Sequence, residues 1–307
     1  MKNSTATGTT ATADAGPGAA GAPYRGRFAP SPTGALHTGS LVAALASWLD
    51  ARAHGGTWII RMEDLDTPRV LPGAADAILA TLAAFGLESD EPVLYQSARH
   101  AAYAQALEAL QSHHRAYRCN CSRNEIAGVY QGHCRELALR NPDSAWRLRL
   151  NDGLIHFEDA LQGDCSRTAA ELGDPVIVRR DGLAAYQLAV VVDDAAQRIT
   201  HVVRGADLLE STCWQLAIWQ ALGLAPPRFA HIPVVTEPDG SKLAKSRRSV
   251  AINPARAAAG LIDALTILQQ QPCEELTTAP VRDILDWAVK NWRPARLAGH
   301  QEVRLRT

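Results

Sequence analysis

Residues 27 to 41 read RFAPSPTGALHTGSL, and this stretch decides the fold. Residues 25 to 29 predict a short β-strand, and the Pro- and Gly-rich segment 30 to 34 predicts a turn. Beyond the turn, Leu41, Leu45, Trp48 and Arg52 recur at helical spacing on one face. The stretch therefore predicts a strand, a loop and a helix in that order.

The same alternation extends along the chain. Residues 57 to 62 (TWIIRM) predict a second strand, and helical patterns follow at 74 to 85 and 98 to 114. Further on, residues 185 to 193 (AYQLAVVVD) form an apolar run typical of a buried central strand, and residues 208 to 222 predict a helix. Strands alternating with helices favour an α/β fold with a parallel, nucleotide-binding sheet.

Composition and pattern divide the chain into parts. An Ala-, Gly- and Thr-rich start with almost no large apolar side chain predicts a disordered tail. Cysteines and an irregular loop interrupt the alternation in the middle, and no strand pattern follows at the end. The predicted parts are a tail at 1–23, a split catalytic domain at 24–116 and 175–250, an inserted module at 117–174, and a helical C-terminal region at 251–307.

Bulk composition limits the classes of function only weakly. The 307 residues are 47% hydrophobic and 21% charged, which is typical of a globular protein. Net charge is −1, so a nucleic-acid partner would have to meet a local basic face. Neither a signal-peptide pattern nor a membrane-spanning apolar run is visible in the sequence, and we expect a cytoplasmic protein whose six cysteines are thiols or metal ligands.

Two segments far apart carry groups suited to phosphate chemistry. His37 and Gly39 lie where a loop enters a helix, so backbone N–H groups and the helix dipole favour a phosphate there. Gly39 allows close approach of the nucleotide. In SKLAKS, residues 241 to 246, Lys242 and Lys245 lie three positions apart. Alone, each motif is weak, because a histidine can cap a helix and lysines usually lie on a solvated surface.

Together these segments resemble the two signature motifs of class I aminoacyl-tRNA synthetases. RFAPSPTG followed by RMEDLDTPR, residues 61 to 69, resembles the glutamyl and glutaminyl branch. The resemblance implies a Rossmann-like catalytic domain that binds ATP with magnesium. It assigns catalysis to His37 and Lys245, and ATP binding to His37, Gly39, Lys242 and Lys245.

Two positions depart from the usual motifs. Ser40 stands where the second histidine of the first motif is usual, and Ala244 replaces a serine in the lysine loop. Neither change removes a charge that is essential for activation, so the motifs predict a working activation site, with one hydroxyl donor fewer at Ala244.

The same resemblance implies a glutamate site. A guanidinium such as that of Arg27 can hold a carboxylate bidentately, and Glu63 would offer the substrate ammonium a counter-charge. Taken singly, Glu63 could cap a turn, Tyr186 could be a core aromatic, and Arg204 could pair with Asp207. Jointly, the matches favour glutamate binding by Arg27, Phe28, Ala29, Pro30, Ser31, Glu63, Tyr186 and Arg204.

The inserted module carries clustered cysteines. CNC at 119 to 121 and YQGHC at 130 to 134 would supply three thiolates to a zinc ion that needs four ligands. By ligand chemistry His133 is the better fourth ligand, although it lies next to Cys134. Resemblance to the glutamyl-Q tRNA(Asp) synthetases instead implies Cys119, Cys121, Tyr130 and Cys134. We expect one zinc per chain with Tyr130 as the fourth ligand.

Length then separates two related families. About sixty residues follow SKLAKS, which is too few for a large anticodon-binding region. Resemblance to the glutamyl-Q tRNA(Asp) synthetases implies ATP-dependent activation of L-glutamate and its transfer to queuosine in the anticodon of tRNA(Asp), by a protein that we expect to be a monomer. Two alternatives are a minimal glutamyl-tRNA synthetase that charges a tRNA 3′ end, and a non-catalytic, zinc-containing RNA-binding paralogue.

Overall fold

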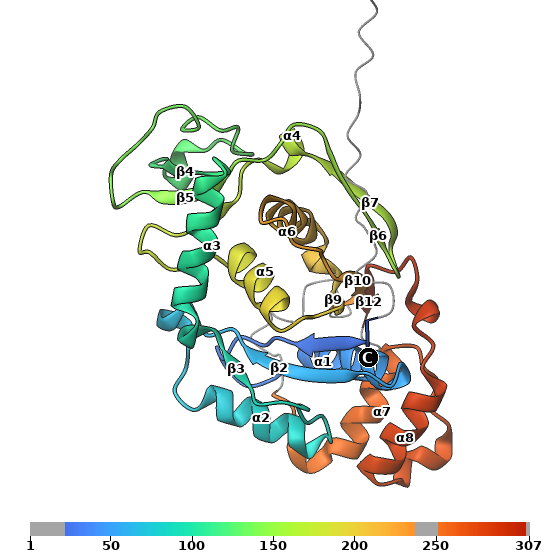
Figure 1. Cartoon of the computed structure of the whole chain (residues 1–307). Coiled ribbons are helices and arrows are strands. Elements are labelled where there is room, and N and C mark those ends of the chain that lie inside the picture. The colour runs from blue at the N-terminus through green and yellow to red at the C-terminus, as the bar shows by residue number, and fades with distance from the viewer. Residues whose placement is uncertain (1–21, 237–250, 305–307) are drawn as a thin grey trace, which may run out of the picture.

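The computed structural model describes residues 22–236 and 251–304 (Figure 1). The predicted tail up to residue 21 lies outside the described residues. So does the SKLAKS motif with Lys242 and Lys245.

The predicted strand, loop and helix at the start of the fold are confirmed. Strand β1 (Arg25–Phe28) is followed by the loop and by helix α1 (Thr38–Ala53). β1 pairs in parallel with β2 (Thr57–Met62), and β2 pairs in parallel with β3 (Leu94–Tyr95). The side chains of β2 are almost wholly buried, which explains its run of large apolar residues.

A second sheet continues the parallel arrangement. Its strand order is β7-β6-β10-β9. β10 is parallel to both of its neighbours, and β6 and β7 form an antiparallel hairpin. The backbone N–H of Thr200 donates to the carbonyl of Arg25, which ties the entry to β9 to β1. The bounds of these strands are β6 (Leu154–Asp159), β7 (Gly163–Thr168), β9 (His201–Gly205) and β10 (Arg228–Ile232).

One predicted strand is wrong. Residues 186 to 193 of this run belong to helix α5 (Tyr186–Ala196), which lies against α6 (Leu209–Ala221) in the middle of the molecule (Figure 1). The short run of valines fits a buried helix as well as a buried strand, so the apolar pattern alone did not decide between them. The remaining helices are α2 (Ala74–Ala84), α3 (His100–Ser112), α4 (Ala169–Leu172), α7 (Ala257–Ile267) and α8 (Val281–Asn291).

A small antiparallel sheet lies apart from the parallel sheets. It has the order β4-β5-β8, with bounds β4 (Ala116–Cys119), β5 (Ala145–Leu148) and β8 (Val176–Val178). Of the clustered cysteines, Cys119 ends β4, and Cys121 and Cys134 lie in the irregular loop between β4 and β5. The boundaries of the inserted module stay a prediction.

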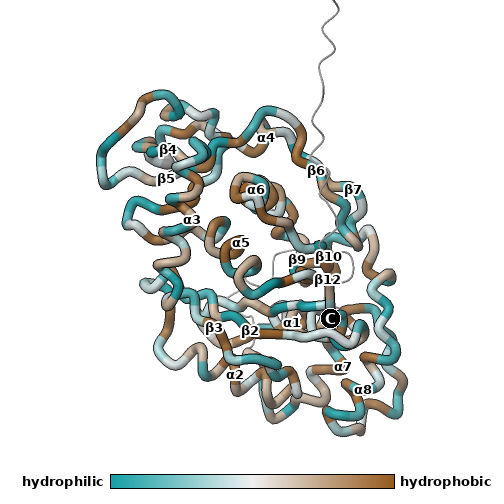
Figure 2. Tube along the Cα trace, in the orientation of Figure 1, coloured by the Kyte–Doolittle hydropathy of each residue, from teal (hydrophilic) through white to brown (hydrophobic). Residues whose placement is uncertain are grey.

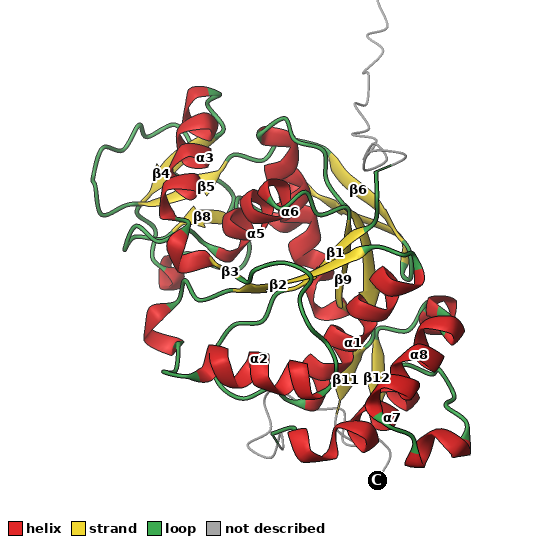
Figure 3. Ribbon diagram, turned by 60° about the horizontal axis from the view of Figure 1, so that its bottom comes forward, coloured by secondary structure: helices red, strands yellow, loops and turns green. Residues whose placement is uncertain are grey.

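The C-terminal region is helical as predicted, with one exception. Strand β12 (Glu302–Arg304) pairs in parallel with β11 (Val234–Thr236), so the expectation of no strand there is wrong. Figure 3 shows α7 and α8 beside α1 and this strand pair. None of the described helices is both long and apolar enough to cross a membrane.

The buried apolar side chains form two large clusters. One joins α1, β2, α7 and α8, and the other joins α3, α5, α6 and the strands beside them. Figure 2 accordingly shows hydrophobic stretches along the inner elements, such as β2 and α6. Parallel strands in α/β folds usually bind ligands beyond their carboxyl ends, and β1 and β9 end at the cleft described next.

Candidate active site

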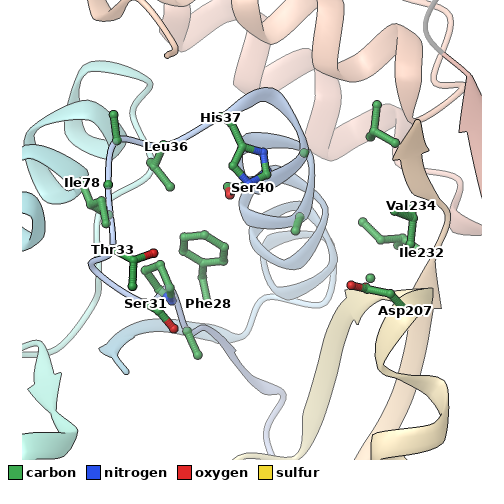
Figure 4. A pocket seen from close by; sticks show the side chains of 18 of the residues that line it. Phe28, Ser31, Thr33, Leu36, His37, Ser40, Ile78, Asp207, Ile232 and Val234 are labelled. Carbon is green, nitrogen blue, oxygen red and sulfur yellow. Dashed lines mark hydrogen bonds between the residues drawn. The ribbon is translucent and has the colours of Figure 1, made fainter. Parts of the chain in front are cut away.

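A cleft of about 530 Å³ lies between the loop after β1 and the ends of β9 and β10. Phe28, Ser31 and His37 line one side, and Asp207 and Val234 face them from the other (Figure 4). The sequence-predicted residues that meet in this cleft are Phe28, Ala29, Pro30, Ser31, His37 and Gly39. The first signature motif therefore forms one wall of a single cavity.

His37 caps the first turn of α1. Its Nδ1 accepts the backbone N–H of Ser40 at 3.4 Å, and its Nε2 lies 3.0 Å from the Ser40 hydroxyl. A side chain at Gly39 would lie 3.2 Å from the imidazole ring. Ser40, which departs from the usual motif, therefore holds the ring in place. Partial burial lowers the pKa of His37, which keeps the ring neutral near pH 7.

Both chain segments that flank the undescribed residues 237–250 reach this cleft. Val235 lines it from β11. On the other side, Ala251 forms an antiparallel bridge with His37, and the N–H of Ile252 donates to Leu36. The described chain thus leaves and re-enters beside the first signature motif.

A second group of predicted residues lies around Arg204, at the end of β9. Its Nη1 lies 3.5 Å from the Tyr186 hydroxyl. Tyr186 keeps 37% of its surface exposed although its hydroxyl reaches inward. Burial raises the pKa of Tyr186, and the charges of Arg204, Glu63 and Arg27 all act on that phenol. Four of the predicted glutamate-site residues, Arg27, Glu63, Tyr186 and Arg204, are therefore neighbours. Arg204 is buried and is not a surface partner of Asp207.

Arg27 is held by a carboxylate that the sequence did not single out. Its Nε and Nη2 donate to Asp194 at 3.2 and 3.3 Å, and Nη1 of Arg61 donates to the same carboxylate at 2.7 Å. The edge of the Arg27 guanidinium formed by Nε and Nη2 is thus already bound to Asp194, which leaves Nη1 for a ligand. Burial raises the pKa of Glu63, while the positive charges of Arg61 and Arg27 oppose that rise.

The clustered cysteines meet in space. The Sγ atoms of Cys119, Cys121 and Cys134 all lie within 4.8 Å of one another. The Tyr130 hydroxyl lies 3.3 Å from Cys119 Sγ and accepts the backbone N–H of Cys134 at 2.9 Å. His133 is exposed and is not part of this group. Three sulfur atoms and one phenol oxygen are therefore close enough to share one metal ion.

Comparison with known proteins agrees with this geometry. The model of the family "tRNA synthetases class I (E and Q), catalytic domain" matches residues 24–259. The glutamyl-Q tRNA(Asp) synthetase of Ectopseudomonas mendocina (strain ymp) is 52% identical over 278 residues, which cover 89% of this chain and 95% of that protein. The chain belongs to the glutamyl-Q tRNA(Asp) synthetase family. It is an enzyme, a ligase with a class I synthetase catalytic domain.

A second relative of this synthetase carries the same name, and a solved structure shares its fold. The Pseudomonas aeruginosa PAO1 glutamyl-Q tRNA(Asp) synthetase is 51% identical, over 89% of this chain and 95% of that protein. A solved glutamate tRNA ligase from Elizabethkingia meningosepticum, in complex with its amino acid, superposes with a TM-score of 0.77 at 25% identity. The match covers 92% of this chain and 67% of that one.

Sequence reasoning missed the buried charged residues behind the site of this synthetase. Asp194 accepts hydrogen bonds from both Arg27 and Arg61. Arg204 donates to His231, which in turn pairs with Asp159. One signal was present: Arg61 interrupts the apolar strand TWIIRM, and a charge inside a buried strand needs a partner. Nothing in the sequence identified that partner, because Asp194 lies over a hundred positions away.

Proposed function

We propose that this synthetase activates L-glutamate with ATP and transfers it to the queuosine base in the anticodon of tRNA(Asp). The observation that carries the proposal is the 52% identity that spans 95% of a relative named for that activity. The cleft and the neighbouring cluster of charged residues supply the chemistry that such a reaction needs.

In the first step an oxygen of the glutamate α-carboxylate attacks the α-phosphorus of ATP. A new P–O bond forms, the bond to the β-phosphate bridging oxygen breaks, and pyrophosphate leaves. ATP enters as its magnesium complex, which offsets phosphate charge. Such a reaction needs positioning and charge stabilisation and no protein nucleophile. His37, Gly39 and the start of α1 would receive the phosphates, since backbone N–H groups there favour an anion.

Glutamate would lie between the two buried guanidinium groups. Among the described residues, Nη1 of Arg27 has no hydrogen-bond partner and Nη1 of Arg204 has only the long contact to Tyr186. Both can therefore donate to a carboxylate. Glu63 lies at the end of β2, where its carboxylate would meet the substrate ammonium. Its backbone N–H donates to Pro30 at 2.9 Å, which fixes β2 to the motif loop.

The lysine loop completes the proposed site. Lys245 would stabilise charge that develops on the phosphates, and Lys242 would bind them. Val235 lines the same cleft as His37, and Ala251 forms a bridge with His37, so the two described ends that flank residues 237–250 support this assignment.

The inserted module would hold one zinc ion. Thiolates and a phenolate suit zinc, and four donors from Cys119, Cys121, Tyr130 and Cys134 would close a structural site. When bound, the zinc would cross-link the loop between β4 and β5. The donor set leaves no open position for catalysis.

In the second step a nucleophile of the RNA attacks the glutamyl carbonyl, and AMP leaves. The test compares three RNAs with labelled glutamate: tRNA(Asp) carrying queuosine, the same tRNA carrying guanosine at that position, and the queuosine form without its terminal CCA. We expect label on the first and third and none on the second.

The structural likeness to a glutamate tRNA ligase favours one alternative, a minimal glutamyl-tRNA synthetase. Labelling that requires CCA and ignores queuosine would establish that alternative. Glutamate-dependent pyrophosphate exchange without any RNA labelling would leave activation in place and overturn the proposed acceptor.

A further inference from the structure

Arg204 is a buried cation that makes no hydrogen bond or ion pair with a described carboxylate. Only 5% of the residue is exposed, and every described partner of its guanidinium is neutral. Nη2 donates to Thr212 and to Gln215, each at 2.7 Å, and Nε donates to His231 at 3.1 Å. Arg27 and Arg61, by contrast, share the carboxylate of Asp194. The positive charge of Arg204 is therefore left for an anion from outside.

His231 can accept the Nε–H of Arg204 only in one tautomer. Its Nε2 must carry a lone pair, so the ring proton has to be on Nδ1. Nδ1 lies 2.6 Å from Oδ2 of Asp159, and both side chains are fully buried. Desolvation lowers the pKa of His231, which agrees with a neutral ring. Asp159 therefore selects the tautomer that Arg204 needs.

The second oxygen of Asp159 is fixed as well. Its Oδ1 accepts the backbone N–H groups of Leu161, Gln162 and His231 at 3.0, 2.9 and 3.1 Å. Those three donors hold the carboxylate in one orientation, with Oδ2 towards the imidazole. The hairpin between β6 and β7 thus fixes Asp159, which in turn fixes the ring of His231 on β10.

We infer that Asp159 and His231 are positioning residues that aim Nη1 of Arg204 at the substrate carboxylate without neutralising its charge. A carboxylate in direct contact with Arg204 would also hold it, but would cancel much of its attraction for an anion. A neutral imidazole holds the guanidinium and leaves the charge available. The inference rests on the proposed function, because it takes glutamate as the ligand of Arg204.

Asp159→Asn tests the tautomer directly. Three backbone donors require an oxygen at the Oδ1 position, so the amide nitrogen would face Nδ1 of His231 and move the ring proton to Nε2. Nε2–H and the Arg204 Nε–H would then oppose each other. We expect KM for glutamate in pyrophosphate exchange to rise about tenfold or more, with a much smaller change in kcat, because the lost contact binds ground state and transition state alike.

A matched pair of variants separates acceptor loss from packing. His231→Gln retains an oxygen that can accept near the Nε2 position, whereas His231→Leu has similar bulk and no acceptor. Both leave Asp159 without its imidazole partner. We expect glutamate affinity, measured by calorimetry, to fall at least about tenfold further in the Leu variant than in the Gln variant. Equal affinities would show that His231 only fills space.

Arg204→Lys separates this inference from the proposed function. If it weakens glutamate binding while Asp159→Asn and His231→Leu do not, Arg204 binds glutamate but the positioning role is wrong. If Arg204→Lys has no effect on glutamate, both the ligand assignment and the inference fail.

Nitrogen-15 NMR spectra of the unsubstituted protein test the tautomer of His231 without relying on any variant to fold. The signals of the His231 ring must show the tautomer with the proton on Nδ1. A ring protonated on Nε2, or on both nitrogens, would overturn the inference.

Discussion

At the scale of single residues, the site depends on one carboxylate that two arginines share. Asp194 is 2% exposed, and the side chain of Arg61 is fully buried. The positive charges of Arg27 and Arg61 outweigh desolvation and keep the pKa of Asp194 below its usual value. Removing that charge would leave two buried guanidinium groups without their shared anion.

We predict that Asp194→Asn lowers the free energy of unfolding by about 3–5 kcal/mol, the range found when one partner of a buried ion pair is removed. Urea unfolding measures the change. Asp181→Asn is the matched control, because Asp181 pairs with Arg179 at 2.7 Å on the surface and should contribute about 1 kcal/mol or less. Similar losses in both variants would contradict the central role of Asp194.

A second prediction at this scale concerns pH. Desolvation lowers the pKa of His231 in the folded protein, and Arg204 and Arg27 add to that effect while Asp159 opposes it. Below a pH of about 6.5 the unfolded chain binds a proton that the folded ring resists, so the free energy of unfolding falls as pH falls. At higher pH the contribution of the neutral ring is complete.

The measurement compares the parent with His231→Gln, which has no ring to titrate. Between about pH 6.5 and 5, the parent should lose more unfolding free energy than the variant. Equal pH slopes would mean that the folded ring titrates like that of the unfolded chain.

At the scale of elements, helix α5 is a segment where the sequence pattern does not distinguish a helix from a strand. Eight residues separate Tyr186 from Asp194, which is about 12 Å along a helix and about 26 Å along a strand. Only the helix lets both residues serve one site. The flanking strands and helices were predictable because their apolar spacing and turn residues agree, whereas the valine-rich run is buried on several sides and shows no period of its own.

The loop between β4 and β5 yields the next prediction. Purified protein should carry about one zinc per chain, and Tyr130→Phe should weaken zinc by more than the roughly tenfold loss typical of an outer-shell partner. His133→Ala is the matched control and should leave the zinc affinity unchanged, since His133 is exposed and does not belong to the cluster of three cysteines. Competition with a chelator measures both. A reversed order of effects would make His133 the fourth ligand.

At the scale of the whole molecule, long-range pairing decides what the sequence left open. The motif residues of the cleft were predictable because each lies at a loop or helix start with recognisable chemistry. The buried partners were not, since Asp194 and His231 meet their arginines, and Asp159 meets His231, only after distant elements assemble. The same holds for β12, a short strand that exists because β11 offers it a free edge.

The last prediction concerns how the C-terminal helices join the body. The indole N–H of Trp292, at the end of α8, donates to Asp50 in α1 at 2.9 Å, and the other carboxylate oxygen accepts the Tyr24 hydroxyl at 2.6 Å. α7 and α8 also share an apolar cluster with α1. We therefore expect Trp292→Phe, which loses a hydrogen bond to a charged group, to lower the unfolding free energy by about 1.5–3 kcal/mol. Hydrogen exchange should quicken in α1 as well as in α8, because the two helices unfold together.

Asp286→Asn is the control, because Asp286 is at an exposed position on α8 with only a 4.0 Å contact to Arg282. It should change neither the unfolding free energy nor the exchange rates. Faster exchange confined to α8 would show that these helices unfold on their own.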